Sequence, residues 1–252
     1  MILQVQDVSF SYRSEPVLDR VAFQAGEGEL IAVLGPNGVG KTTLLRCVNA
    51  VLRPRAGCIL VDGRNVLRLS GPEIAREIGY VAQRSEPARL TAFDAILLGR
   101  KPHITWKASR RDLEIVDAAI KRLGLEQLLL RHVDEMSGGE LQKVCIARAI
   151  VQEPRVMLLD EPTASLDLGN QLDILAFIKH VVDAHRITAL MAVHDLNTAL
   201  RYADRFLFMK EGRIFASGHV EDVTPEIIEA VYGVRVIIER VRGNPVVIPI
   251  DN

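Results

Sequence analysis

The stretch Gly35-Pro36-Asn37-Gly38-Val39-Gly40-Lys41-Thr42-Thr43 decides the fold of this 252-residue chain. It follows the apolar run Leu30–Leu34 and opens a helix-compatible segment, so it has the strand, loop and helix context of a phosphate-binding loop. The glycines let backbone N–H groups turn inward, and the positive end of the following helix adds to the attraction for phosphate. Lys41 is expected to reach the β and γ phosphates, and Thr42 to offer its hydroxyl to Mg²⁺. The motif therefore predicts a nucleoside triphosphate site.

Composition limits the class of protein. With 48% apolar residues, the chain can bury one large α/β core or two closely joined lobes. The net charge of -1 supplies no overall field for nucleic acid or an anionic membrane, so such a partner would have to be recognised locally and no nucleic acid is expected. Cys47, Cys58 and Cys145 lack metal-ligand spacing and fit reduced thiols in a cytosol. No apolar run approaches the ~18 residues of a membrane span, and the alternating start Met1–Asp7 has no basic n-region, so we expect no secretion signal.

Hydrophobic periodicity divides the chain into a strand-rich front, a helical middle and an alternating end. Front strands are predicted at Leu3–Phe10, Val17–Phe23 and Cys58–Val61. Middle helices are predicted at Thr91–Arg100, Ser109–Leu123 and Gly138–Gln152. Buried strands are predicted at Val156–Leu159, Thr188–Val193 and Phe206–Met209, with a crossover helix at Leu168–Val182. We expect an α/β protein whose helical block is inserted in one folding unit.

A second motif is the apolar strand Arg155–Leu159 that ends in Asp160 and Glu161. A carboxylate at the end of a strand beside the phosphate loop can hold Mg²⁺, which suits Asp160. Glu161 can then polarise the water that attacks the γ phosphate, a general-base role worth ~10²–10⁴ in rate. The alternative is that Asp160 and Glu161 are simply a solvated acidic strand end. The phosphate loop upstream favours the catalytic interpretation over this alternative.

The segment Met136-Ser137-Gly138-Gly139-Glu140-Leu141-Gln142 permits two interpretations. Ser137 and Glu140 form a capping box that would simply start a helix. The capping box does not explain Gly138 and Gly139, since each glycine costs a helix ~1 kcal/mol relative to alanine. An approaching phosphate would explain them, because small residues leave the helix N-terminus open as an anion site. Two anion sites in one chain predict that two copies sandwich the nucleotide.

With these motifs in order, the sequence resembles the ATP-binding subunit of an ABC transporter over essentially its whole length. The resemblance implies one ABC domain over 1–252, with a mostly parallel core sheet, an antiparallel β subdomain and a helical subdomain at approximately 84–153. It implies that Gln83 touches Mg²⁺ or the attacking water, that His194 contacts the γ phosphate, and that Tyr12 stacks on adenine. Asp167 ends the segment Ala164-Ser165-Leu166-Asp167, which matches the D-loop, and is counted among the nucleotide-binding residues, while Ser137, Gly138 and Gly139 match the signature. Met136 departs from the usual leucine, an isosteric change expected to leave function intact.

Softer signals resemble the ATPases of importers for iron-siderophores, haem and vitamin B12. They are the run from Leu90 to His103, the segment Val231–Val234 and the segment Pro245–Pro249. The resemblance implies an ATPase at the cytoplasmic face of the membrane that works with a second copy of itself, separate permease chains and an external binding protein. Three alternatives stay open: a soluble ABC ATPase of a cytosolic assembly machine such as iron-sulfur cluster biogenesis, a scaffold that binds ATP without turnover, and a small-molecule kinase.

The segment Arg84–His103 is a candidate for coupling to the permease, because it begins beside Gln83 and runs to the surface of the helical region. Leu90, Phe93, Ile96 and Leu97 have helical spacing and could either meet a partner or pack the local core. Gly99–His103 looks exposed, so we expect it to dock the permease.

Overall fold

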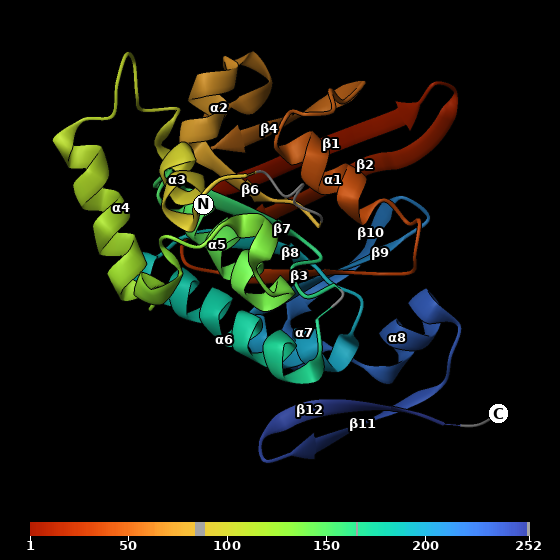
Figure 1. Ribbon diagram of the computed structural model, residues 1–252. Coiled ribbons are helices and arrows are strands. Elements are labelled where there is room, and N and C mark those ends of the chain that lie inside the picture. The colour runs from red at the N-terminus through yellow and green to blue at the C-terminus, as the bar shows by residue number, and fades with distance from the viewer. Residues whose placement is uncertain (84–88, 165, 251–252) are drawn as a thin grey trace.

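A six-stranded sheet lies at the centre of the molecule (Figure 1). The computed structural model describes residues 1–83, 89–164 and 166–250. The strand order is β10-β9-β3-β8-β7-β6, and every neighbouring pair is parallel except β9 and β10. The strands are β3 (Leu30–Leu34), β6 (Ile78–Val81), β7 (Val156–Asp160), β8 (Thr188–Ala192), β9 (Arg205–Lys210) and β10 (Arg213–His219). Every residue of β3, β7 and β8 is buried, so their sequences are almost continuously apolar.

Side chains on the two faces of this sheet pack into two different hydrophobic cores. Ile31 and Val33 of β3 join the core that contains α1 (Lys41–Val48), whereas Leu30, Ala32 and Leu34 join the core on the opposite face. The second core is covered by the helices α6 (Leu168–His185), α7 (Leu196–Tyr202) and α8 (Pro225–Tyr232). Burial of both faces identifies this sheet as the structural centre.

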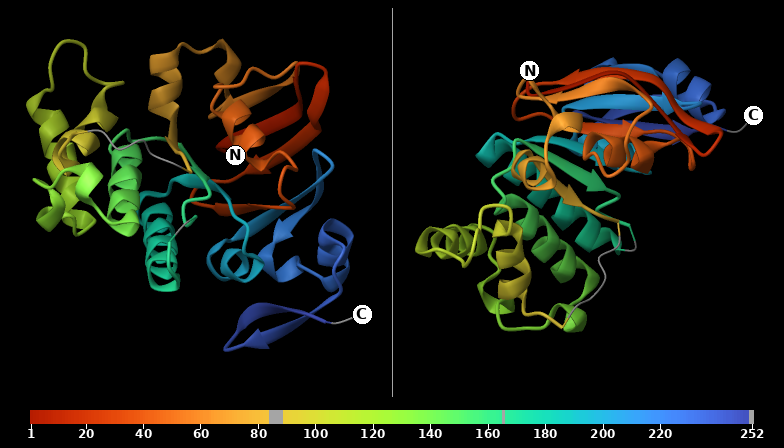
Figure 2. Two further views of the ribbon diagram at one scale, coloured as in Figure 1. Left: turned by 45° about the vertical axis from the view of Figure 1, so that its right-hand side comes forward. Right: turned by 90° about the horizontal axis from the view of Figure 1, so that it is seen from above.

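An antiparallel sheet of order β2-β1-β4-β5 packs on the α1 side (Figure 2). Its strands are β1 (Leu3–Tyr12), β2 (Glu15–Ala25), β4 (Ala56–Val61) and β5 (Arg64–Asn65). A 3₁₀ turn (Val66–Arg68) and α2 (Gly71–Glu77) connect this sheet to β6. Together the two sheets confirm the predicted fold class, and the predicted front strands are present with slightly different ends.

The middle of the chain forms a helical lobe with its own core. It contains α3 (Ala92–Leu97), α4 (Arg110–Arg122), α5 (Gly138–Ile150) and the 3₁₀ turns Leu98–Arg100, Glu126–Leu128 and Val133–Glu135. Ile96 is fully buried in this core, and Leu90, Phe93 and Leu97 pack against it. The apolar residues of α3 therefore serve the lobe itself, which decides between the two interpretations of their spacing.

The expectation that Gly99–His103 is exposed was right only for Lys101: Gly99 and Arg100 are buried, and Pro102 and His103 are half-buried. The Arg100 side chain is buried, and it donates from Nε to Asp112 Oδ1 at 3.0 Å and from Nη1 to the carbonyl of Val151 at 2.6 Å. A Cβ on Gly99 would lie 2.1 Å from the carbonyl oxygen of Arg148. Sequence periodicity could not reveal this packing. An arginine in a charged stretch is expected to be exposed to solvent, unless a buried carboxylate partner is known.

The chain ends in a 3₁₀ turn (Val220–Asp222), α8 and an antiparallel hairpin of β11 (Val236–Val241) and β12 (Asn244–Pro249). Asn197 of α7 holds the hairpin through two hydrogen bonds to the backbone of Val247. These elements were not predicted, and neither were α2, α7, β5 and β10. Each of them is short or has only a weak alternation of apolar and polar residues. Within the described residues, no helix is both long and apolar enough to span a bilayer.

Candidate nucleotide site

Four neighbouring parallel strands deliver the candidate residues to one edge of the central sheet. Gly35 follows β3, Glu161 follows β7, and His194 and Gln83 lie two residues beyond β8 and β6. Because the strands are parallel and adjacent, their carboxyl ends meet at the edge where open α/β sheets bind ligands. A cavity of about 330 Å³ opens there. Its lining comprises Asn37, Gly38, Gly40, Lys41, Thr42, Thr43, Gln83, Glu161 and His194.

The phosphate loop has the backbone that its glycines permit. Gly35, Gly38 and Gly40 have φ values of 145°, 78° and 109°, which L side chains rarely adopt. Gly40 is the N-cap of α1, so the first N–H groups of this helix face the cavity mouth. Lys41 Nζ donates to the carbonyl oxygens of Gly35 at 2.7 Å and Pro36 at 3.1 Å. Burial lowers the pKa of Lys41, while Glu161 and Asp160 act in the opposite direction.

Thr42 and Asp160 form an oxygen-rich pair beside this loop. Thr42 Oγ1 donates to Asp160 Oδ1 at 2.8 Å. A hydroxyl and a carboxylate are the hard oxygen donors that Mg²⁺ prefers, so these residues fit the ion. Among the described residues, no group of three or more His, Cys, Asp or Glu could hold a metal. A bound Mg²⁺ would therefore complete its shell with phosphate oxygens and water, as is usual in phosphate-transfer sites.

Glu161 lies between the other two predicted catalytic residues. Gln83 Nε2 donates to Glu161 Oε2 at 2.5 Å, and His194 Nε2 contacts Glu161 Oε1. The Glu161 side chain is 14% exposed and that of His194 is 46% exposed. Glu161 has φ of +52°, and its N–H donates to the carbonyl of Ala192 at 3.0 Å. A left-handed conformation in a non-glycine residue at a cavity is typical of a functional site.

Tyr80 of β6 joins this site although the sequence did not single it out. Its hydroxyl donates to Asp160 Oδ2 at 3.0 Å, so Asp160 is held at both oxygens. Burial, followed by the charge of Asp160, raises the pKa of Tyr80, and a hydrogen bond to Tyr80 raises the pKa of Arg46. The only sequence signal was a phenol three residues before Gln83, at the end of a strand that had not been predicted.

The other candidate residues lie outside the cavity lining. Tyr12 is exposed on β1 and meets Phe10 edge to face with ring centroids 4.9 Å apart. Ser137 caps α5: its hydroxyl accepts from the Glu140 N–H at 3.3 Å, and its own N–H donates to Glu140 Oε2 at 2.9 Å. The Ser137 hydroxyl also donates to Glu140 Oε2 at 2.9 Å, and the two bonds that Ser137 donates to this carboxylate lower the pKa of Glu140. Asp167 caps α6 through the N–H of Asn170. Ser165 of the predicted D-loop and residues 84–88 of the coupling segment lie outside the described residues.

The two signature glycines have different surroundings. Gly139 is buried, and a Cβ there would lie 2.7 Å from Asn170 Oδ1 of α6. Helix packing therefore explains this glycine without a ligand. Gly138 is exposed beside exposed Ser137, and its added Cβ would meet only the end of the Leu166 side chain, at 3.0 Å. Ser137 and Gly138 thus remain accessible at the start of α5.

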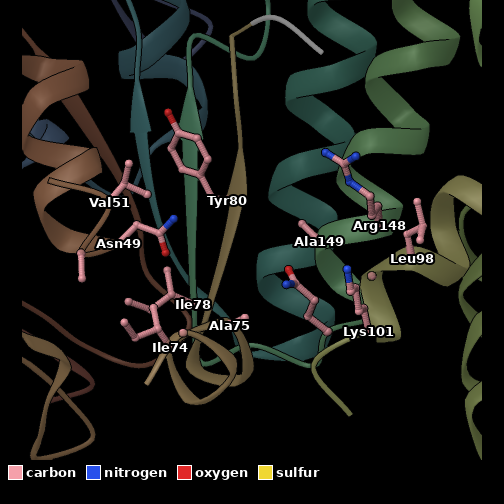
Figure 3. Close-up of a pocket in the computed structure, with 14 residues that line it drawn as sticks. Asn49, Val51, Ile74, Ala75, Ile78, Tyr80, Leu98, Lys101, Arg148 and Ala149 are labelled. Atoms are coloured by element: carbon pink, nitrogen blue, oxygen red, sulfur yellow. The ribbon is translucent and has the colours of Figure 1, made fainter. Parts of the chain in front are cut away.

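A larger cavity, of about 620 Å³, separates the end of α1 and α2 from the helical lobe (Figure 3). Asn49 and Val51 border it on one side, and Leu98, Lys101 and Arg148 on the other. Tyr80 lines this groove and also donates its hydrogen bond to Asp160, so a single side chain contacts both the groove and the nucleotide site.

A profile of the ABC transporter family matches residues 18–164, which include the phosphate loop, the signature and the Asp160–Glu161 pair. The chain belongs to this family. It is an ATPase of the ABC type, and the family binds ATP. An uncharacterized ABC transporter ATP-binding protein of Methanocaldococcus jannaschii is 51% identical over 99% of this chain and 98% of that protein. The ferric enterobactin transport ATP-binding protein FepC of Escherichia coli is 35% identical over 98% of this chain and 94% of its own length.

Solved structures extend the similarity to three dimensions. A metal-chelate type ABC transporter in an inward-facing conformation matches with a TM-score of 0.86 and 28% identity, covering 99% of this chain and 97% of that chain. A dimeric ATP-binding cassette with bound ADP and phosphate matches with a TM-score of 0.74 and 25% identity, covering 87% of this chain and 99% of that chain.

Proposed function

We propose that this chain is the ATP-hydrolysing subunit of a membrane importer for a metal chelate or a cofactor of the iron-siderophore, haem or cobalamin class. The observation that carries the proposal is the convergence of Lys41, Glu161, Gln83 and His194 on one cavity in a chain of the ABC transporter family. The substrate class rests on similarity to the ferric enterobactin protein and to the metal-chelate type transporter.

The contacts of each side chain suggest its role in hydrolysis. Lys41 exchanges its loop carbonyls for the β and γ phosphates, and the N–H groups at the start of α1 bind the same anion. Thr42 and Asp160 would hold Mg²⁺, which when bound would offset the negative charge of the phosphates. Glu161 accepts a proton from the attacking water. Gln83 and His194 orient that carboxylate and water, because both already contact Glu161.

Two copies complete each site in this proposal. Ser137 and Gly138 are exposed and belong to the start of a helix, where a phosphate binds favourably. The cavity around Lys41 is lined by neither residue, so a second chain would supply them. Asp167 would lie in the same interface, and Tyr12 would stack on adenine. The dimeric cassette bound to ADP and phosphate supports this arrangement.

The groove of about 620 Å³ is the proposed docking site for separate permease chains at the cytoplasmic face of the membrane. One wall of the groove comes from the end of α1, α2 and β6, and the other comes from the helical lobe. We propose this lobe as an inserted subdomain at approximately 84–153. Leu98 is exposed, as is Val51 across the groove, and both would contact an inserted segment. An external binding protein would deliver the substrate to the permease.

Cysteine crosslinking tests this function. We expect single cysteines at Val51, Leu98 or Lys101, in a Cys58→Ser background, to crosslink to a permease that co-purifies with the chain. A cysteine at Glu239, on the C-terminal hairpin, is the matched control and should not crosslink. Purification with a soluble assembly complex, with no membrane protein and no crosslink, would contradict the importer and favour the cytosolic ATPase.

A further inference from the structure

The loop of residues 101–109, between the 3₁₀ turn Leu98–Arg100 and α4, carries an exposed aromatic among exposed cations. Trp106 is 94% exposed and is the only tryptophan of the chain. Lys101, Lys107, Arg110 and Arg111 are all exposed, and no Asp or Glu occurs from Lys101 to Arg111. This concentration of positive charge is local, since the whole chain has a net charge of -1.

Nearby acidic groups leave most of this charge uncompensated. Asp112 is buried and hydrogen-bonded to Arg100 and Ser109, inside the lobe. Glu114 pairs with Arg110 at 2.9 Å. Among the described residues, Lys101, Lys107 and Arg111 form no ion pair within 4.0 Å. Three cations thus stay available around Trp106.

The base of the loop is held firmly. His103 Nε2 is 2.9 Å from the carbonyl oxygen of Gln152, and Ser109 forms a capping box with Asp112 at the start of α4. Arg76 of α2 donates to the carbonyl of Pro102 at 2.9 Å, so the loop adjoins α2 at the edge of the groove. In Figures 1 and 2 the loop and α2 rise at the same end of the molecule.

We propose that this loop, with Trp106 at its centre and Lys107 and Arg111 beside it, contacts the anionic lipid surface next to the permease. Tryptophan favours the interface between water and acyl chains, and each nearby cation adds to the attraction for anionic headgroups. This inference rests on the proposed function, because docking of the permease in the groove decides which side of the molecule faces the membrane. Binding by the loop alone is weak, and simultaneous docking on the permease strengthens it through effective concentration.

The emission of Trp106 tests the contact directly, because no other tryptophan contributes. The full chain, without permease, is titrated with vesicles of phosphatidylcholine alone or with equal amounts of phosphatidylglycerol. We expect a blue shift and quenching by brominated lipid only with the anionic vesicles, and loss of both at high salt, because salt screens exposed charges. Lys107→Gln with Arg111→Gln should weaken binding roughly twenty-fivefold, at about fivefold per cation.

Two controls separate this loop from the rest of the surface. Lys121→Gln with Arg122→Gln removes two cations at the other end of α4 and should leave binding within about twofold, since those charges lie beyond the screening length. In a Trp106→Phe chain, Leu130→Trp places the reporter at a residue that is 87% exposed after α4, and it should not shift. Basal ATPase activity of all variants reports correct folding.

The proposal is overturned if Trp106 emission does not shift with anionic vesicles, or if it shifts equally with neutral vesicles. In a second titration, the neutral vesicles carry the permease; a shift that occurs only with these vesicles also overturns the proposal and assigns the loop to the permease instead. Because the vesicles of the first titration contain no permease, its result is independent of the crosslinks from Val51 and Leu98 that test the importer.

Discussion

At the scale of single residues, the site depends on two carboxylates that share one strand end and have different neighbours. Asp160 accepts hydrogen bonds from Thr42 and Tyr80, which hold both of its oxygens in place. Glu161 meets Gln83 and His194, and its side chain reaches the cavity. Adjacent residues of a strand point in opposite directions, and the left-handed backbone of Glu161 turns the chain at this point. The two carboxylates can therefore serve a metal and a water separately.

Glu161→Gln should retain ATP binding and lose turnover, because the amide preserves size and hydrogen bonding while removing the base. We expect steady-state hydrolysis to fall by ~10²–10⁴. Calorimetry should give an ATP affinity close to that of the unmodified chain, and light scattering should detect an ATP-bound dimer. Glu239→Gln on the hairpin is the control and should hydrolyse normally. Turnover within tenfold of the unmodified chain would refute the assigned role.

Tyr80→Phe should weaken the contribution of Mg²⁺ to nucleotide binding, since Asp160 loses one of its two hydrogen-bond donors. Partners that orient a metal ligand typically contribute ~10–100-fold to metal affinity. The measurement is the ratio of ATP dissociation constants with EDTA and with Mg²⁺, which should fall by about tenfold. Tyr202→Phe, which removes a hydroxyl from α7, is the matched control. An unchanged ratio would show that Tyr80 only packs.

At the scale of elements, the helical lobe is held together by a buried ion pair rather than by its apolar core alone. Arg100 joins the 3₁₀ turn after α3 to Asp112 in the first turn of α4 and to Val151 after α5. Hydrogen bonds from Ser109 and then the charge of Arg100 lower the pKa of Asp112 from 3.8 to about 2. The charged form of Asp112 is thus the form that stabilises the folded lobe.

Asp112→Asn should destabilise the protein at pH 7, because it removes the buried carboxylate that pairs with Arg100 and leaves this buried cation with only the half-exposed Glu153, at 2.8 Å. Breaking a buried ion pair generally costs about 3–5 kcal/mol, and the remaining pair with Glu153 places the expected loss toward the lower end. A lowered pKa stabilises the fold above the unfolded value and loses that effect as pH falls. The difference between the two proteins should therefore shrink as pH decreases from 3.8 toward about 2. Urea unfolding at several pH values measures it, with exposed Asp117→Asn as the control. A difference that does not change with pH would exclude the charge of Asp112 as its source.

At the scale of the whole molecule, one chain presents the parts of the proposed site on separate surfaces. The cavity around Lys41 belongs to the edge of the central sheet, whereas Ser137 and Gly138 belong to the helical lobe. The groove lies between these two parts, and Tyr80 connects its wall to Asp160. A partner in the groove could thus respond to any movement of the lobe relative to the sheet.

A hybrid dimer tests whether sites are shared. One chain carries Lys41→Ala and the other carries Ser137→Arg, so a shared arrangement leaves one site with both changes and one site with neither. Calorimetry should then detect one tight ATP site per hybrid dimer. Each variant alone should have both sites damaged, because every site would contain one changed residue. Equal binding at both sites of the hybrid would show that each chain forms its site alone.

The sequence by itself determined the fold class, four of the six strands of the central sheet (β3, β7, β8 and β9), the helices α5 and α6, and the residues that line the cavity. These follow from local rules: glycine spacing specifies the phosphate loop, and apolar runs specify the buried strands that bring Asp160, Glu161 and His194 to one edge. Only the tertiary structure decided what lies beside them. The hydrogen bond from Tyr80, the burial of Arg100 and the contact of Gly139 with Asn170 join residues remote in the chain. No periodicity along a chain encodes such pairs, because they depend on which elements pack together.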